Sequence, residues 1–252
     1  MTEPAAAKLY VILGSHACRT GMLMLDHKGI AYRAVNLPTG LQPLLLRLRG
    51  FASNPVRRRI GNRRPSMLAM ADRLGTVPAL RYDGHRVQTN REIARFLDRL
   101  RPDPPLFAAD PERRAAIEEA ERWGDEVLQM TARRLALAAV LHGRDGMIDR
   151  GNDGRLGPLL WRNETVRLVG TGLLARSVFR ANRATEPELL ESLPGMLDRV
   201  DGWIGAGVLN GEEKNAADFM IAPSLALLCY RRDLKAQVEA RPAGELLERV
   251  LP

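Results

Sequence analysis

Two side chains near the N-terminus, Ser15 and Cys18, carry a hydroxyl and a thiol, groups that can take part in thiol chemistry. Both lie in the segment Ser-His-Ala-Cys-Arg at positions 15–19, directly after an apolar run. A hydroxyl at the first turn of a helix can donate a hydrogen bond to a bound thiolate, and the helix N-terminus lowers the pKa of that thiol. If Cys18 were exposed and acidic, thiol exchange would become possible instead. We favour Ser15 as the working residue, because a lone cysteine one turn later is more often packed beneath the turn.

A second polar group stands at the expected start of another helix. Apolar residues from Ile93 to Leu100 recur with helical spacing, and Thr89 and Glu92 have the spacing of a capping box. Thr89 is therefore expected to cap this helix. The first N–H groups of a helix have no partner within it, so they attract an anion such as a carboxylate.

The elements that must position these groups can be read from the pattern of apolar residues. Residues 9–13 form a continuous apolar run that is typical of a buried strand, and a helix should follow and end near Gly29. Residues 31–35 should form a second strand. Residues 38–66 are rich in Pro and Gly and indicate a loop with interrupted helix, followed by a short helix at 67–74. Strands at 77–82 and 86–88 should make a hairpin around Asp83-Gly84.

Strand patterns end at the Pro-rich segment 101–105, which indicates a linker. A long helix should begin at Asp110-Pro111, and a Gly-rich break is expected at 143–157. Further helices are expected around 159–180, 193–204, 217–228 and 245–251. The sequence therefore predicts an α/β domain at 8–101 and an all-helical domain at 108–252.

This order of elements resembles the glutathione-transferase superfamily, in which a thioredoxin-like domain precedes a helical bundle. The segment 15–19 is similar to the family's Ser-Pro-x-Cys or Cys-Pro-x-Cys turn, and Thr-Val-Pro-Ala-Leu at 76–80 is similar to Val-Pro-x-Leu. Gln-Thr-Asn-Arg-Glu-Ile at 88–93 occupies the place of Glu-Ser-x-x-Ile. Asn-Ala-Ala-Asp-Phe at 215–219 resembles the family's buried N-capping box.

The resemblance implies a site for glutathione or another small thiol. It implies a cis bond between Val77 and Pro78, with the Val77 backbone pairing with the thiol peptide. It also places the carboxylate end of the thiol at Thr89, Asn90 and Arg91. Two departures weaken the match, since His16 replaces the proline of the first turn, and Thr89 and Asn90 replace the acid and serine that hold the γ-glutamyl group.

By the same resemblance, the protein would be a homodimer that conjugates or exchanges the thiol with a hydrophobic electrophile. Because neither a membrane span nor a secretory signal is recognisable, the cytoplasm is the expected location. No metal is expected. The altered Thr89-Asn90 pair favours an alternative, a non-catalytic binding or chaperone-like protein of the same fold. Trp123, Val127 and Met130 could line the electrophile site, but packing of the core explains this stripe equally well.

The bulk composition excludes several other classes of protein. No apolar run is long enough to span a membrane, no secretory signal is recognisable, and the two cysteines do not have metal-ligand spacing. The net charge of +8 would favour nucleic acid as a binding partner, because basic side chains attract phosphate. However, 34 of the 38 basic residues are arginines, which fits a GC-rich genome. The densest basic stretch, 57–64, also has no interleaved aromatic side chains, so we expect no nucleic-acid partner. Because no apolar run is long enough to span a bilayer, we expect no membrane partner either.

Overall fold

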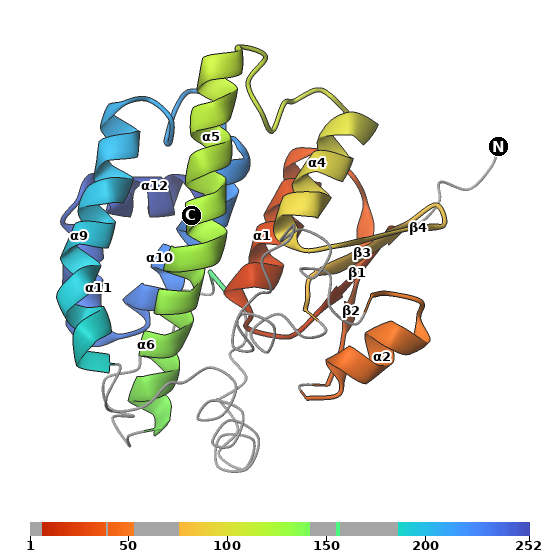
Figure 1. Ribbon diagram of the computed structural model, residues 1–252, viewed down its shortest axis with the longest axis horizontal. Helices are drawn as coiled ribbons and strands as arrows, with labels where there is room; N and C mark the ends of the chain where they lie inside the picture. Colours follow the sequence, from red (N-terminus) through yellow and green to blue (C-terminus); the bar gives the residue numbers. More distant parts are fainter. Residues whose placement is uncertain (1–6, 39, 53–75, 142–154, 157–185) are drawn as a thin grey trace, which may run out of the picture. The chain divides into compact units, whose positions relative to one another are not determined.

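The computed structural model describes residues 7–38, 40–52, 76–141, 155–156 and 186–252 of the 252-residue chain. Contacts between Cα atoms divide the chain into two compact units, residues 1–104 and 105–252. The first contains a sheet and helices, whereas the described residues of the second form helices without strands (Figure 1). The predicted fold class, a thioredoxin-like domain followed by a helical bundle, is confirmed. The expected helices at 67–74 and 159–180 and most of the Gly-rich break lie outside the described residues.

The N-terminal unit is built on a mixed four-stranded sheet with the order β2-β1-β3-β4. β1 pairs in parallel with β2 and antiparallel with β3, which forms a hairpin with β4. The hairpin turn holds Asp83 and Gly84 at φ angles of 42° and 77°, as a tight two-residue turn requires. The strands are Ala7–Val11 (β1), Tyr32–Asn36 (β2), Ala79–Tyr82 (β3) and His85–Gln88 (β4).

Helices cover both faces of this sheet (Figure 1). Helix α1 (His16–His27) provides the crossover that parallel strands need, and it packs against α4 (Asn90–Leu100). Gly29 follows α1 with a φ of 58°, as its expected role in ending the helix requires. The other face carries α2 (Gln42–Leu48), within the stretch expected to be loop with interrupted helix.

The C-terminal unit surrounds an apolar central helix. α10 (Ala216–Cys229) is buried at every position, and it packs against α5, α6, α11 and α12. Helix α5 (Pro111–Trp123) continues through a π-helical turn, η2 (Gly124–Leu128), into α6 (Gln129–Leu141). A Cβ atom on Gly124 would lie 2.9 Å from Ile221 Cγ1, so only glycine fits where this turn meets α10. The remaining described helices are α9 (Glu186–Gly205), α11 (Arg232–Glu239) and α12 (Pro242–Val250).

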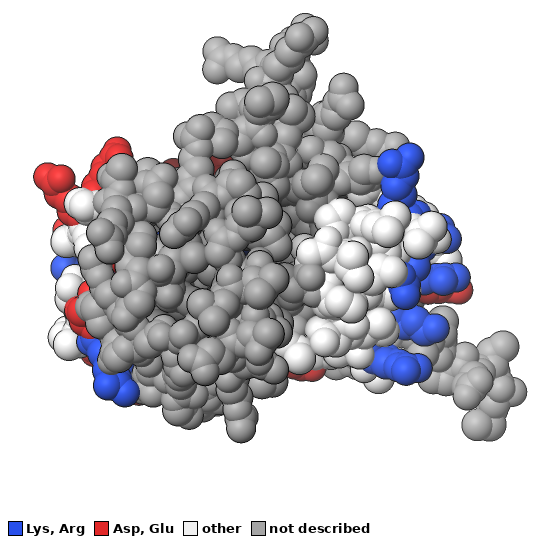
Figure 2. Space-filling model, turned by 90° about the horizontal axis from the view of Figure 1, so that it is seen from below, with Lys and Arg blue, Asp and Glu red and all other residues white. Residues whose placement is uncertain are grey.

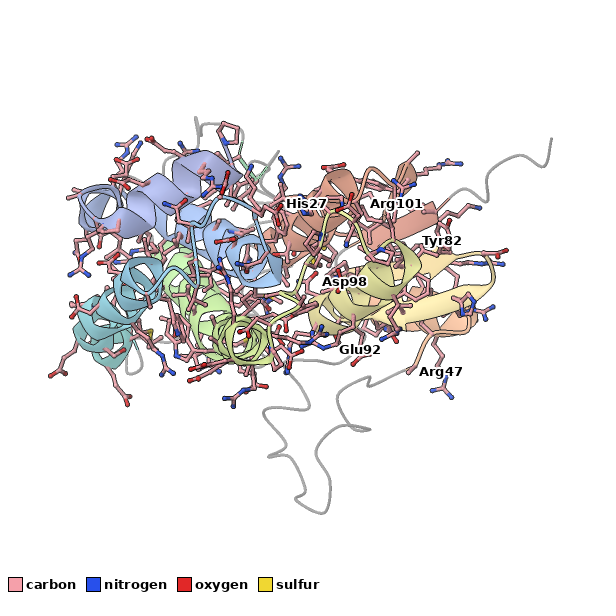
Figure 3. All side chains as sticks on the ribbon, turned by 90° about the horizontal axis from the view of Figure 1, so that it is seen from above. His27, Arg47, Tyr82, Glu92, Asp98 and Arg101 are labelled. Atoms are coloured by element: carbon pink, nitrogen blue, oxygen red, sulfur yellow. The ribbon has the colours of Figure 1, made fainter. Side chains whose placement is uncertain are left out.

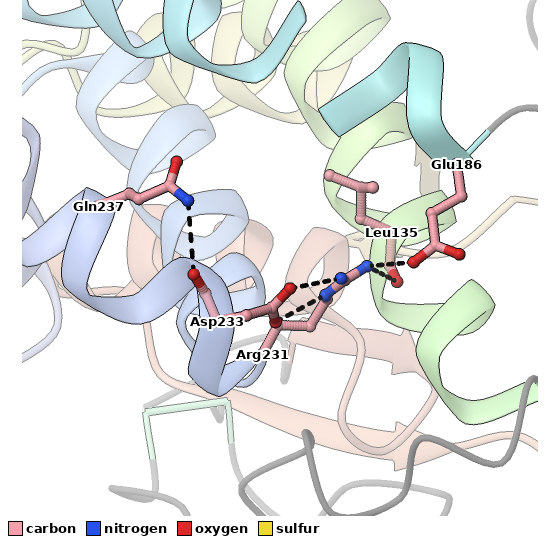
Figure 4. Close-up of polar contacts among 5 residues, drawn as sticks. All are labelled: Leu135, Glu186, Arg231, Asp233 and Gln237. Atoms are coloured by element: carbon pink, nitrogen blue, oxygen red, sulfur yellow. Dashed lines mark hydrogen bonds and ion pairs between the residues drawn. The ribbon is translucent and has the colours of Figure 1, made fainter. Parts of the chain in front are cut away.

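Two polar clusters fix helix ends inside this unit. Asn215 and Asp218 form the expected capping box of α10, in which the Asp218 carboxylate accepts from the N–H groups of Asn215 and Asn210 at 2.8 Å each. Burial raises the pKa of Asp218 in spite of these hydrogen bonds. Separately, the buried Arg231 guanidinium donates to Glu186, Asp233 and the carbonyl of Leu135 (Figure 4). The Nε, Nη1 and Nη2 groups of Arg231 therefore each donate to an acceptor, as a buried charge requires.

A buried lysine joins the ends of α1 and α4 in the N-terminal unit. The fully buried Lys28 Nζ donates to Asp98 Oδ1 at 2.8 Å and to the carbonyl of Arg101 at 2.7 Å. Arg101 in turn donates to the carbonyls of Lys28 and Gly29. Asp98 and Arg101, at this end of α4, are labelled in Figure 3. The two helices are therefore held together at their C-terminal ends by charge-assisted hydrogen bonds.

None of the helices in the described part of the chain is long and apolar enough to cross a bilayer.

Candidate functional site

Ser15 stands at the first turn of α1 with its hydroxyl group engaged as an acceptor. It is the N-cap residue, with extended backbone angles, and its Oγ accepts from the Cys18 N–H at 3.3 Å. The side chain is half-buried. Because this contact uses a lone pair of the oxygen, the hydroxyl proton can still be donated to another group. The arrangement combines a hydroxyl donor with the positive end of a helix dipole.

Cys18 lies one turn further along and is packed beneath the turn. Only 1% of the residue is exposed, and its Sγ accepts from the Ile12 N–H at 3.5 Å. His16, which stands where the family has proline, is also buried rather than exposed. A thiol in this position would reach an external partner only after the turn had moved.

The bond between Val77 and Pro78 is cis, as the resemblance implied. Pro78 lies directly against α1, because a Cβ atom added to Gly21 would be 3.1 Å from Pro78 Cγ. The same Cβ atom would be 3.4 Å from Asn90 Oδ1. Gly21 is therefore the point where α1, Pro78 and the start of α4 meet, and any larger residue there would push them apart.

Thr89 begins α4 with an unusual backbone conformation. Its φ and ψ angles are 71° and 143°, a region that a β-branched residue rarely occupies and that costs about 1 to 3 kcal/mol. Its hydroxyl accepts from the Glu92 N–H at 3.4 Å and its carbonyl accepts from the Ile93 N–H at 3.0 Å, so the expected capping role is confirmed. Strain of this kind persists only where the surrounding structure holds it, and it is common at ligand-binding sites.

Asn90 does not present its side chain to the surface. It is 3% exposed, and its Nδ2 donates to the carbonyl of Ala17 in α1 at 2.8 Å. Its Oδ1 is a buried acceptor that receives no hydrogen bond, and Nε2 of the adjacent Gln88 is a buried donor that makes none. Arg91, the second residue of α4, is half-buried. The side chain in the family's serine position therefore ties two helices together instead of facing outward.

The structure thus brings the first turn of α1, Pro78 and the start of α4 to one place in the N-terminal unit. Sequence analysis missed Gly21 and Gln88 as members of this group. The signal for Gly21 was a glycine inside an otherwise continuous helical pattern, which often marks a close approach of another backbone or ring. Among the described residues, no group of three or more His, Cys, Asp or Glu side chains could hold a metal ion.

A family model, the N-terminal domain of glutathione S-transferase, matches residues 9–105. This stretch contains the turn at Ser15, Pro78 and the start of α4. Residues 9–105 are a glutathione S-transferase N-terminal domain. The expected resemblance to the glutathione S-transferase superfamily is confirmed for residues 9–105 by this match, and solved structures of that superfamily share the fold of the chain.

Solved structures with the glutathione S-transferase fold align with both units. Glutathione S-transferase I bound with lactoylglutathione has a TM-score of 0.60 at 14% identity, covering 98% of this chain and 99% of its own. A glutathione S-transferase from Sinorhizobium meliloti has a TM-score of 0.58 at 19% identity, covering 98% and 88%. One from Methylobacterium radiotolerans, in complex with glutathione sulfonate, has a TM-score of 0.52 at 17% identity, covering 97% and 90%. No curated protein sequence matches this chain significantly.

Proposed function

We propose that the protein binds glutathione or another low-molecular-weight thiol in its N-terminal unit and conjugates or exchanges it with a hydrophobic electrophile. The observation that carries this proposal is the half-buried Ser15 hydroxyl at the N-terminus of α1. It belongs to the same domain as Pro78 and the start of α4, which meet α1 at Gly21. Structures of the same fold were solved with lactoylglutathione and glutathione sulfonate, two derivatives of glutathione, which supports a glutathione-like peptide as the ligand.

Each group would have one role in this reaction. The Ser15 hydroxyl donates to the thiolate sulfur, and with the N-terminus of α1 it stabilises the negative charge. The Val77 backbone pairs with the thiol peptide, and the N–H groups of Asn90 and Arg91 bind its carboxylate at the N-terminus of α4. The thiolate then attacks the electrophile, so that a carbon–sulfur bond forms while the leaving group departs with its electron pair. No step needs a metal.

The burial of Cys18 favours Ser15 as the residue that handles the thiol. Thiol exchange by Cys18 would require its sulfur to reach a disulfide partner, whereas the residue is 1% exposed and its Sγ accepts a backbone N–H. The hydroxyl of Ser15 needs no such movement. We therefore assign Cys18 to packing under the turn in this proposal.

A second candidate function is favoured by the orientation of Asn90. In the family the acid and serine at this point hold the γ-glutamyl group, whereas here Asn90 is turned inward to Ala17. A non-catalytic binding or chaperone-like protein would need no such side chains. It would keep the fold and lose efficient use of the thiol.

Calorimetric titration with glutathione and with mycothiol, followed by a conjugation assay with a chlorodinitrobenzene, separates the two functions. The transferase proposal expects binding and turnover, with turnover strongly lowered in Ser15→Ala and retained in Cys18→Ala. Binding without turnover would support the non-catalytic protein. If no small thiol binds at millimolar concentration, the transferase proposal is wrong.

A further inference from the structure

Four basic side chains lie side by side across the sheet of the N-terminal unit. The strand register pairs Lys8 with Arg33 on one side and with Arg81 on the other, and it pairs Arg81 with Arg86. Directly paired residues project from the same face of a sheet. The four residues, which we call the basic row, therefore line one face over about 14 Å, given about 4.8 Å between neighbouring strands. All four are exposed.

The basic row lowers the stability of the sheet, so folding does not explain its presence. Like charges placed directly opposite one another on neighbouring strands destabilise a sheet. The four strands contain no Asp or Glu, and their Lys and Arg residues all belong to the row. No ion pair with an acidic side chain from the described part of the chain offsets this charge. Arg86 is also fixed in place, because its Nε donates to the carbonyl of Arg49 at 2.9 Å.

Helix α2 covers the remainder of the same face. Tyr10 is two residues from Lys8 on β1, so its side chain projects from the same side of the sheet. There it packs in a buried cluster that includes Leu46 of α2. The basic row and α2 therefore lie on one side of the sheet.

The outer surface of α2 is an apolar stripe. At 100° per residue, Leu41, Leu44 and Leu48 fall within a narrow arc on the side of the helix opposite Leu46. They are 53%, 57% and 73% exposed, which makes them the most exposed large apolar residues of the described chain. Arg47 stands beside them and extends away from the helix (Figure 3). Because Leu46 points into the sheet, this leucine stripe points away from it, in the same direction as the basic row.

We propose that this face docks on the surface of an anionic lipid bilayer. The basic row would pair with the negatively charged headgroups, and the leucine stripe would enter the boundary between headgroups and acyl chains. Apolar helix faces bury about 5 to 10 Å deep in this boundary, and each nearby cation adds an attraction to anionic lipid. Basic side chains gather at the right-hand edge of Figure 2, where the strands and α2 lie in Figure 1.

The leucine stripe favours lipid over nucleic acid as the partner. Surfaces that bind single-stranded nucleic acid combine cations with aromatic side chains on which the bases stack. The large apolar residues exposed in the described part of the chain are all leucines, which offer bases no stacking surface. Leucine beside arginine is instead the composition of surfaces that insert into lipid interfaces.

The test is flotation of the full chain with vesicles of phosphatidylserine and phosphatidylcholine in equal parts, compared with vesicles of phosphatidylcholine alone. We expect binding only to the anionic vesicles, weakened by added salt. Lys8→Gln with Arg81→Gln should weaken binding roughly 30-fold, at about fivefold for each charge. Arg99→Gln with Arg232→Gln removes the same charge from exposed positions on helices α4 and α11, so it should change binding little.

The stripe is tested by Leu44→Ser with Leu48→Ser, which should weaken vesicle binding by about tenfold or more. Leu100→Ser, at a position on α4 that is 41% exposed, is the control and should bind normally. Thermal melts of all variants establish that they fold. The proposal is overturned if anionic vesicles do not bind, or if the control pair loses as much affinity as the row pair. Two other results would also overturn it. In the first, the chain binds an oligonucleotide more tightly than anionic vesicles, and the leucine substitutions leave that binding unchanged. In the second, the leucine substitutions change the oligomeric state measured by light scattering but not the binding to vesicles.

Discussion

Replacing Asn90 by serine should change ligand affinity and stability in opposite directions. Asn90→Ser removes the buried hydrogen bond from Nδ2 to the carbonyl of Ala17, which contributes about 0.5 to 1.5 kcal/mol. The Ala17 carbonyl keeps a second lone pair for its helical partner, and the unpaired Oδ1 is removed as well, so we expect a net loss near 1 kcal/mol. For a chain of this size, that loss lowers the melting temperature by about 2 to 4 °C.

The same change restores a hydroxyl at the family's serine position. A hydrogen bond to a carboxylate is worth about 1.5 to 3 kcal/mol, so glutathione should bind Asn90→Ser roughly 10- to 150-fold more tightly than wild type. Asn90→Ala is the matched control, because it loses the contact with Ala17 and gains no hydroxyl. Calorimetry and thermal melts should show lower stability in both variants and tighter binding in the serine variant alone. Equal affinity of the two variants would refute the assignment of the carboxylate to this helix start.

Four further measurements test the roles assigned to individual side chains and the expected homodimer. Ser15→Ala should lower kcat/KM for conjugation by roughly 30- to 150-fold, because a lost donor to a thiolate costs about 2 to 3 kcal/mol. Cys18→Ala should instead lower mainly the melting temperature. Steady-state kinetics in which Cys18→Ala lowers kcat/KM more than Ser15→Ala would contradict this assignment. Lys28→Met should lower the free energy of unfolding, measured in urea, by about 3 kcal/mol, because it leaves Asp98 without its cation. The control Lys235→Met, at an exposed ion pair, should lower it by less than about 1 kcal/mol. Partial burial and the nearby Asp26 carboxylate raise the pKa of Tyr32 to about 12 from 10.0. A pH titration of tyrosine absorbance should therefore contain a component near pH 12, and Asp26→Asn should lower that pKa. Because the pKa is higher in the folded state, the stability it provides is present below pH 10.0 and lost between pH 10.0 and about 12. The family resemblance implies a homodimer, so light scattering at micromolar concentration should give twice the chain mass of 28.0 kDa, and a monomeric mass would remove that expectation.

Features that depend on local periodicity could be predicted from the sequence. The apolar run before Gly14, the Asp83-Gly84 turn and the capping residues of α4 and α10 are each determined by neighbouring residues, and each is present. Helix α2 was less clear because it lies in a stretch dense in Pro and Gly, where breaker residues obscured the helical spacing of its leucines. The residues of α1 and α4 that join the helix ends, Lys28 and Asp98, are 70 positions apart, and no periodic pattern connects them.

The basic row shows why charge could not be interpreted along the chain alone. Basic residues are densest along the sequence at 57–64, whereas Lys8, Arg33 and the pair Arg81 and Arg86 come from three separate parts of the sequence. Strand register brings them together, and register is set by pairing that one strand cannot reveal. In the same way, motif matching placed Asn90 in the ligand position, but only the packing of α4 on α1 determines that its side chain turns inward.

The candidate site depends on how firmly α1 is joined to α4, because Ser15 begins the first helix and Thr89 begins the second. The helices run side by side and are tied at both ends, by Asn90 to Ala17 near their starts and by Lys28 to Asp98 near their ends. The Asn90 contact fixes the residue next to Thr89, so the φ of 71° at Thr89 cannot relax without breaking a buried hydrogen bond. Asn90, which stands where the family has serine, therefore offers no side-chain contact to a ligand. It instead holds the backbone N–H groups at the start of α4 in a fixed position relative to Ser15.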